Sequence, residues 1–272
     1  MKKILSLILV VILTAGCFSG CKKDKGDPPI LPPAESMQID FSNFTGNAKS
    51  ADQDFENKGT ENLNWETAAL IAGTWRTIIY VTLAIPVASF KAAVDQDPAY
   101  LSENKWQWSY NVIAAGISYK ARLTGEIRAS DVKWEMYITR EGTDAFSEFK
   151  WFEGTSKKDA SGGQWVLTES NTVQTPVLQI DWTKSGTSVG TIKYTYLKSG
   201  SGSGAYIDYG LKSGSDYDAF FSIHYYNSSL ARFSDVNIEW NTTSKKGRIK
   251  SSDYLDGQWQ CWNETKVNSV CN

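Results

Sequence analysis

The sequence predicts a mainly β protein of the α+β class. We expect a large curved antiparallel meander sheet, or a barrel, of about a dozen strands wrapped around one long apolar helix. Two observations carry this prediction. From residue 106 onward, short segments alternate apolar and polar residues, and turn residues separate almost every pair. Before them, a stretch at about 65–94 is apolar on nearly every face. A sheet of that size curls because strands twist, and the helix is the obvious body for it to enclose.

The elements before the meander follow from local patterns. Residues 37–44 alternate apolar and polar side chains, which predicts a first strand. The polar stretch 45–62 reads as a loop. Asn64 can cap the helix that follows, and Glu66 suits its first turn. Pro86 should kink or restart the helix.

The helix is long enough to cross a membrane over residues 68–90, so two interpretations compete. Arg76 would then lie well inside the bilayer, at a cost of roughly 2.5–3.5 kcal/mol. We therefore favour burial inside the domain, with the helix covered on all sides. That interpretation makes Leu70 and Ile78 core residues, and it predicts that the domain is soluble without detergent.

The segments after the helix share one property, which is an apolar side chain at every second position. They are Trp106–Val112, Ile117–Leu123, Val132–Ile138, Phe149–Trp151, Trp165–Leu167, Leu178–Trp182, Ile192–Tyr196, Tyr206–Leu211, Phe221–Tyr225, Val236–Trp240, Ile249 and Trp259–Trp262. Turn signals lie between them, among them residues 141–142, 161–163, 184–186, 213–215, 246–247 and 256–257.

The tryptophans are the most tempting candidates for a binding surface, because aromatic faces stack on sugars and bases. Most are in phase with Val, Ile and Leu of their own strands, as Trp134 is, which predicts core positions. Trp259 and Trp262 differ because they flank Cys261 and cannot all share one face. We expect at least one of those aromatic side chains to be exposed.

The N-terminus resembles a bacterial lipoprotein signal. Lys2 and Lys3 form a basic start, residues 4–15 are apolar, and small residues then lead twice to cysteine, at Cys17 and at Cys21. This resemblance implies cleavage, a diacylglyceryl cysteine, and a place in the bacterial cell envelope, on the periplasmic or surface face of the outer membrane.

The four cysteines help to choose the lipidation site. Cys261 and Cys271 lie close together at the C-terminus and can pair in an oxidising compartment. If Cys21 is lipidated, Cys17 leaves with the signal and no thiol is left over. The residue three positions before a lipidated cysteine is usually bulky and apolar. Phe18, three before Cys21, meets this better than Thr14, three before Cys17. We favour Cys21, with Cys17 as the alternative.

These observations divide the chain into three parts. Residues 1–20 form the signal peptide, and residues 21–35 hold the lipidated cysteine and a proline-rich tether, since proline-rich segments act as semi-rigid spacers. Residues 36–272 form a single β-rich domain. The net charge of −2 and the pI near 5.6 give no basic footprint for nucleic acid.

The candidate catalytic and metal residues have ordinary explanations. His224 is the single histidine and points to the opposite face from Ile223 and Tyr225, which favours a solvent-facing or hydrogen-bonded strand residue. The pairs Asp95/Asp97 and Asp216/Asp218 could bind calcium through oxygen, but acidic turn residues are common. Nucleophile, zinc and phosphate-loop motifs are absent from the sequence.

The glycine- and serine-rich stretch 200–204 is a flexible loop by composition, and we favour a plain hairpin tip over a binding loop. The predicted architecture and signal together resemble the barrel-and-helix lipoproteins and lipoprotein carriers of the bacterial envelope. We expect no catalytic residue, metal or cofactor. The expected function is non-enzymatic binding of an apolar ligand or an envelope partner. Two alternatives stay open, a glycan-binding or glycan-hydrolysing surface lipoprotein and a purely structural one. An interior cavity of ~300 Å³ or more would favour ligand binding.

Overall fold

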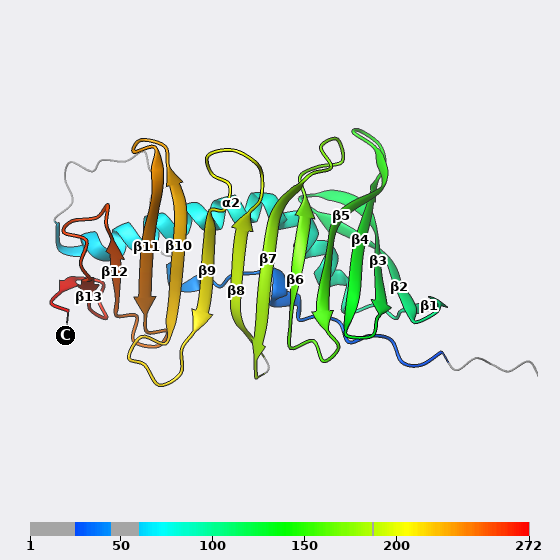
Figure 1. Ribbon diagram of the computed structural model, residues 1–272, viewed down its shortest axis with the longest axis horizontal. Helices are drawn as coiled ribbons and strands as arrows, with labels where there is room; N and C mark the ends of the chain where they lie inside the picture. Colours follow the sequence, from blue (N-terminus) through cyan, green and yellow to red (C-terminus); the bar gives the residue numbers. More distant parts are fainter. Residues whose placement is uncertain (1–24, 45–59, 187, 272) are drawn as a thin grey trace, which may run out of the picture.

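A computed structural model describes residues 25–44, 60–186 and 188–271. Fourteen strands form one sheet in which each strand pairs antiparallel with the next along the chain, so the predicted meander is confirmed. The sheet is open, because β1 and β14 are the two ends of the strand order. Figure 1 shows β1 and β13 at opposite ends of the sheet. The strands are β1 Ala99–Ser102, β2 Lys105–Ala114, β3 Ile117–Ile127, β4 Asp131–Arg140, β5 Phe146–Lys157, β6 Gly162–Thr168, β7 Pro176–Ser185, β8 Ser188–Tyr196, β9 Tyr206–Leu211, β10 Ala219–Asn227, β11 Arg232–Trp240, β12 Gly247–Ser251, β13 Gln260–Trp262 and β14 Asn268–Ser269.

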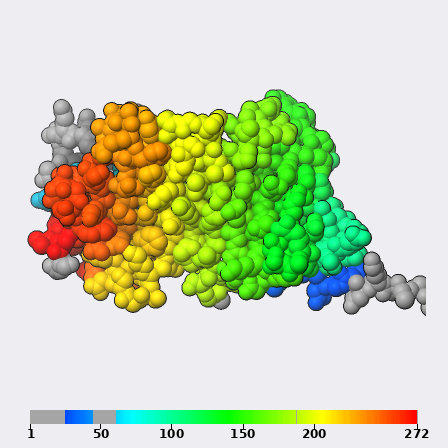
Figure 2. All heavy atoms as spheres, viewed as in Figure 1, coloured from blue at the N-terminus to red at the C-terminus, as the bar shows by residue number. Residues whose placement is uncertain are grey.

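Burial along the strands follows the two-residue period of the sequence. In β4 the apolar residues Val132, Trp134, Met136 and Ile138 are all buried, and the residues between them are only partly covered. Successive side chains of a strand point to opposite faces, so the sheet has one apolar inner face and one polar outer face. Figure 2 shows that outer face as a continuous surface, with the helix hidden behind most of it.

On the inner face, one row of cross-strand neighbours alternates tryptophan and glycine from β2 to β6. The row runs Trp106, Gly125, Trp134, Gly154 and Trp165, each paired with the next. A Cβ atom added to Gly125 would lie 2.6 Å from the Trp134 ring. Each glycine therefore leaves the space into which a neighbouring indole packs, which explains why residues of low strand propensity stand in the middle of strands.

The long helix α2 spans Leu63–Ala93 and lies across the inner face of the sheet (Figure 1). It contacts β12, β13 and β14 at one end of the sheet and β2 and β3 at the other. The predicted helix at 65–94 is thus confirmed within two residues. It continues without interruption through Pro86, whose ring is buried.

Asn64 does not cap the helix, contrary to our expectation. The helix begins at Leu63, so Asn62 has the cap position and Asn64 lies in the first turn. The Asn64 side chain instead binds the C-terminal part of the domain. Its Nδ2 donates to the Cys261 carbonyl at 2.8 Å, and its Oδ1 accepts from the Tyr254 hydroxyl at 2.8 Å. The side chain that we read as a local cap is therefore a long-range link between the first turn of α2 and the last strands.

The expectation that the sheet covers the helix on all sides is wrong. Ala68, Ala72, Leu83 and Phe90 are buried against the sheet, but the opposite side of α2 is open. Leu70 and Ile78, which we expected in the core, are exposed, as are Tyr80 and Val81. An open sheet presents one inner face to the helix, so a uniformly apolar helix is left with an uncovered apolar side.

Within the described residues, α2 is the one helix whose length and composition alone would allow a membrane span. Its buried side nevertheless packs into the same core as the sheet, with Leu83 and Phe90 among the core residues. This packing agrees with the interpretation of α2 as a domain helix.

The predicted first strand at 37–44 is wrong as a strand. Two 3₁₀ turns, η1 Ala34–Met37 and η2 Ser42–Phe44, enclose an extended stretch that pairs with no described strand. Its alternation is real, since Met37, Ile39 and Phe41 are buried and the residues between them are exposed. The side chains alternate because the segment lies on the sheet, where η1 contacts β7 and β8.

The described part of the proline-rich tether is packed on the domain rather than free. Pro29 and Pro32 are buried, and a Cβ atom at Gly125 would come 3.0 Å from the Pro29 ring. The Lys25 ammonium lies 5.7 Å above the ring of Tyr100 in β1. A fragment that begins at Lys25 keeps every helix and strand that the structure describes.

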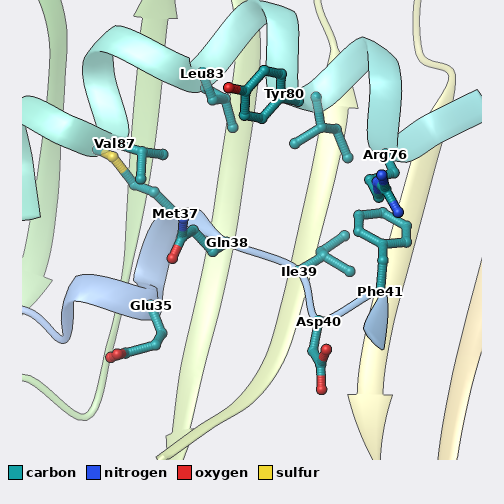
Figure 3. A pocket seen from close by; sticks show the side chains of 11 residues that line it. Glu35, Met37, Gln38, Ile39, Asp40, Phe41, Arg76, Tyr80, Leu83 and Val87 are labelled. Atoms are coloured by element: carbon teal, nitrogen blue, oxygen red, sulfur yellow. The ribbon is translucent and has the colours of Figure 1, made fainter. Parts of the chain in front are cut away.

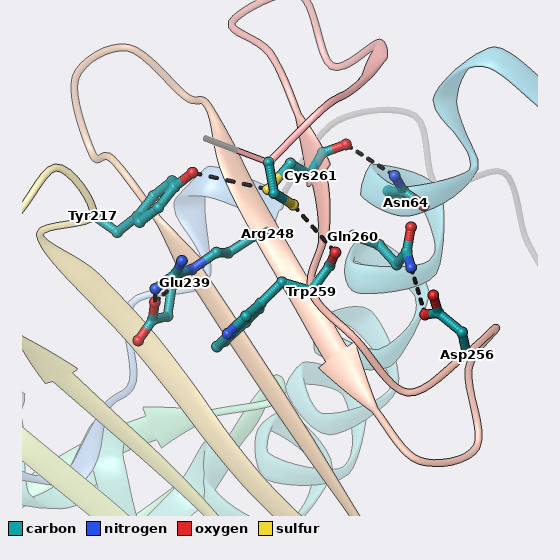
Figure 4. Close-up of a disulfide and its surroundings, with 9 residues drawn as sticks. Asn64, Tyr217, Glu239, Arg248, Asp256, Trp259, Gln260 and Cys261 are labelled. Atoms are coloured by element: carbon teal, nitrogen blue, oxygen red, sulfur yellow. Dashed lines mark hydrogen bonds and ion pairs between the residues drawn. A yellow bond between two sulfur atoms is a disulfide. The ribbon is translucent and has the colours of Figure 1, made fainter.

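The predicted disulfide joins Cys261 in β13 to Cys271, with their Cα atoms 5.3 Å apart (Figure 4). Cys261 is buried and Cys271 is half-buried. The bridge closes the C-terminal hairpin of β13 and β14, which is the last edge of the sheet. The two strands of this edge are short, and without the bridge they would be free to fray.

Replacing Cys271 with alanine should lower the free energy of unfolding by about 2–3 kcal/mol, the loop-closure value for a ring of this size. Urea unfolding of the fragment from Lys25, oxidised and reduced, measures it. The reduced wild type is the control and should match the variant. Alkylation of both cysteines without prior reduction would contradict the bridge itself.

Candidate functional site

An open cleft lies between α2 and the segment that contains η1 (Figure 3). Its volume is about 380 Å³. The residues that line it come from these two elements only: Glu35, Met37, Gln38, Ile39, Asp40 and Phe41 on the segment, and Arg76, Ile79, Tyr80, Leu83 and Val87 on the helix. The site is therefore built by the two parts of the chain that lie on the inner face of the sheet.

The helix presents one edge to the cleft. Arg76, Tyr80, Leu83 and Val87 follow each other at spacings of four, three and four residues, which places them along one side of an α-helix. Figure 3 shows Val87 above Met37 at one end and Arg76 above Phe41 at the other. The walls are thus mostly apolar over the length of the cleft.

The opposite wall is fixed to the sheet by hydrogen bonds. The Tyr194 hydroxyl in β8 donates to the Met37 carbonyl at 2.7 Å, and the Trp165 indole donates to the Ser36 hydroxyl at 3.1 Å. Complete burial raises the pKa of Tyr194 far above its ordinary value. The hydroxyl therefore stays protonated and remains a hydrogen-bond donor. Phe41 packs on Phe221 with ring centroids 5.4 Å apart. The cleft is therefore bounded by a held segment.

Charge at the cleft is unevenly placed. The Glu35 and Asp40 carboxylates point away from the helix, whereas the Arg76 side chain extends from α2 toward the segment (Figure 3). Among the described residues, Arg76 forms no ion pair. An apolar trough with a guanidinium at one end suits an elongated apolar ligand. The described lining brings no nucleophile and base together.

His224 lies on the outer face of the sheet, as its strand phase predicted. Its ring stacks on Phe233 with centroids 4.3 Å apart and on Tyr206 with centroids 5.4 Å apart. Its Nδ1 is 2.7 Å from an Asp235 carboxylate oxygen. These partners account for the histidine as a hydrogen-bonded strand residue of the outer face.

The aspartates of the two pairs either accept hydrogen bonds within the domain or lie in exposed loops without further metal ligands nearby among the described residues. Asp218 accepts hydrogen bonds from the Thr242 backbone at 2.7 Å and from its hydroxyl at 2.8 Å, which ties two loops together. Asp95 and Asp97 are exposed after the end of α2, and Asp216 also lies in an exposed loop. In the ranges that the structure describes, no three His, Cys, Asp or Glu side chains gather as a metal site.

The expectation of an exposed aromatic beside Cys261 is wrong. Trp262 is buried and its indole donates to the Lys245 carbonyl at 2.9 Å. Trp259 is half-buried beneath Arg248, whose guanidinium lies 4.2 Å from the ring centroid and pairs with Glu239 (Figure 4). The Cys261 neighbourhood is therefore packed, and it offers no aromatic platform.

Tryptophans elsewhere do not form a sugar platform either. Eight of the eleven are buried and the other three, Trp75, Trp151 and Trp259, are half-buried. An aromatic ring can stack on a sugar only where one of its faces is open to solvent. The stretch 200–204 lies in the connection between β8 and β9, as expected of a hairpin tip.

Sequence reasoning missed the cleft itself. The alternation of Met37, Ile39 and Phe41 predicted burial, but it carried no information on which element would lie opposite. One signal was present and was discounted, namely Arg76 as a lone charge in an apolar helix. A charge in such a place marks either the solvent side or a site, and here Arg76 lines the cleft.

Comparison with known proteins gives no relative from which a function can be carried over. No family model matches the chain, and no curated protein or solved structure matches it significantly.

Proposed function

We propose that this protein is a lipid-anchored, non-enzymatic lipoprotein of the bacterial cell envelope that binds an elongated apolar ligand in the cleft between α2 and residues 35–41. The observation that carries the proposal is the cleft of about 380 Å³ with mostly apolar walls. It exceeds the ~300 Å³ at which small-molecule sites begin. A purely structural lipoprotein has no need of such a space, and the packed tryptophans speak against the glycan alternative.

The anchor is the first part of the proposal to test. Replacing Cys21 with serine should abolish incorporation of labelled fatty acid, because the thiol that takes the diacylglyceryl group is gone. Replacing Cys17 with serine is the matched control and should leave labelling intact. The measurement is metabolic labelling followed by immunoprecipitation. Labelling that survives in Cys21→Ser and disappears in Cys17→Ser would move the anchor to the alternative cysteine.

The cleft is tested by filling it. Val87→Trp should reduce binding of cis-parinaric acid, a fluorescent fatty acid, by tenfold or more, because the indole would occupy the volume that the chain needs. A tenfold loss corresponds to about 1.4 kcal/mol. Energy transfer from the many tryptophans to the bound probe reports binding to the fragment from Lys25.

The matched control is Ile113→Trp. Ile113 in β2 is exposed on the outer face, because its neighbour Val112 belongs to the inner core. This variant adds the same indole away from the cleft and should bind the fatty acid as the wild type does. If wild type, Val87→Trp and Ile113→Trp bind cis-parinaric acid with equal affinity, the cleft is not the binding site.

A further inference from the structure

The outer side of α2 carries an exposed stripe that is apolar in composition. Its members recur at helical spacing, and we call them the α2 stripe: Leu70, Thr74, Thr77, Ile78 and Val81. The stripe is about 17 Å long, at 1.5 Å of rise per residue. The solvent side of a helix in a globular domain normally carries charged and polar residues. Between Glu66 and Lys91, Arg76 is the one charged residue of this helix.

The threonines of α2 do not make this side polar. The Thr74 hydroxyl donates to the Leu70 carbonyl at 2.9 Å, and the Thr77 hydroxyl donates to the Gly73 carbonyl at 3.0 Å. Thr82 does the same toward Ile78 at 2.9 Å. Because these hydroxyls already have partners within the helix, covering them with an apolar surface leaves no donor unsatisfied. The whole stripe can therefore be buried against an apolar surface without losing hydrogen bonds to water.

The segment at 45–59 is a poor candidate to cover the stripe. It contains five charged residues and a single aromatic, Phe55, with no leucine, isoleucine or valine. A polar segment of this kind gains little by lying on an apolar helix. The cover is better sought outside the domain.

The path of the chain favours a lipid surface. Lys25 lies over Tyr100, and Pro29 lies at Gly125, so the described N-terminus is held against β1 and β3. Lys25 is four positions after Cys21, which allows a separation of at most about 14 Å between their Cα atoms. An anchor at Cys21 therefore brings the bilayer next to the end of the sheet where α2 terminates.

We propose that the α2 stripe lies against the surface of the lipid bilayer to which the protein is anchored. This inference rests on the proposed anchor. A tether this short holds the domain at a high effective concentration beside the membrane, so a small apolar face is enough for docking. Tyr80 borders the stripe beside Val81 and is exposed, and its side chain suits the interface because it combines an apolar body with a polar tip.

The test places an environment-sensitive dye at matched positions. The fragment from Lys25 lacks Cys17 and Cys21, and its two remaining cysteines form the disulfide, so Val81→Cys and Ile113→Cys each add one free thiol. Val81 is 75% exposed and Ile113 is 74% exposed, the first on α2 and the second on the outer face of the sheet. Each variant is labelled with a nitrobenzoxadiazole dye.

An N-terminal hexahistidine tag then tethers the labelled fragment to phosphatidylethanolamine–phosphatidylglycerol vesicles through a nickel-chelating lipid, whatever the natural anchor is. We expect the dye at Val81 to shift to the blue and to be quenched by nitroxide-labelled lipids. The dye at Ile113 should keep its spectrum in water. Adding Ile78→Glu to the Val81 variant should remove the shift and the quenching.

Three outcomes would overturn the docking. In the first, the dyes at Val81 and Ile113 behave alike. In the second, the spectrum of the Val81 dye stays that of a dye in water. In the third, the Val81 dye shifts without vesicles as protein concentration rises, which would mean that a second copy covers the stripe. None of these outcomes bears on the anchor, which fatty-acid labelling of Cys21→Ser decides separately. Loss of the tagged fragment from the soluble fraction before vesicles are added would instead favour a spanning α2.

Discussion

We expect Leu83→Asp to unfold the domain and Val81→Asp, two residues earlier on the same helix, to leave it folded. Leu83 is 2% exposed and packs into the core between α2 and the sheet. An aspartate there loses the apolar contacts of leucine and leaves a buried carboxylate without a partner, which together cost about 5 kcal/mol or more. A loss of that size equals the whole stability of many domains. Val81 faces solvent, and its replacement changes stability by less than about 0.5 kcal/mol.

Circular dichroism and urea unfolding of the two variants measure this difference. The pair also tests the corrected view of the helix. Leu70→Asp and Ile78→Asp would have been the disruptive variants if the sheet enclosed α2, and in the open sheet they should behave as Val81→Asp does. A folded Leu83→Asp, or an unfolded Val81→Asp, would mean that the buried side of α2 is assigned wrongly.

We expect Gly154→Ala to lower the free energy of unfolding by about 3 kcal/mol, the upper end of the cost of overpacking a core. The added Cβ atom would meet the backbone oxygen of Gln164 and the ring of Trp165 well inside van der Waals contact. A backbone atom cannot move away as the end of a flexible side chain can. The strain therefore falls on the pairing of β5 with β6 or on the Trp165 ring. Urea unfolding followed by tryptophan fluorescence measures it.

The same substitution at Gly73 is the control and should have the opposite sign. A Cβ atom there meets nothing within 4 Å, and Gly73 lies in the middle of α2. Alanine is the better helix former by about 0.8–1.0 kcal/mol, so Gly73→Ala should stabilise the domain by a similar amount. If both variants lose stability equally, the row of tryptophans and glycines is not what makes Gly154 necessary.

The strands of the meander were predictable because their burial is governed by the two-residue period and by neighbours close in sequence. Val132, Trp134 and Met136 show this, since all three are buried as their phase required. The same period misled at residues 37–44, because alternation records which side chains are covered and says nothing of hydrogen bonding. That segment lies on the inner face of the sheet and joins no strand that the structure describes.

Glycine gave a second misreading for a physical reason. We expected a turn at 161–163, yet Gly162 and Gly163 begin β6, and Gly163 lies against Trp182. A glycine that makes room for an indole and a glycine that makes a turn look alike in a sequence. Only the cross-strand register, which depends on turns elsewhere, separates the two.

The cleft and the open side of the helix could not be predicted, because both depend on how far the sheet closes. An apolar helix gives the same pattern whether one side or every side is covered, so Leu70 and Leu83 are indistinguishable in the sequence. Asn64 shows the same limit at one residue, since its position predicted a local cap and its partners lie in the last strands of the domain.

The position of α2 across the sheet determines how the domain unfolds. In a meander each strand pairs only with its neighbours, and an array of this kind resembles a repeat protein, in which one end can melt while the other persists. Here α2 touches β2 and β3 at one end of the array and β12 to β14 at the other. Losing either end therefore uncovers part of the same helix and weakens its hold on the other end. We therefore expect the helix to make this one-dimensional array of hairpins unfold as one cooperative unit.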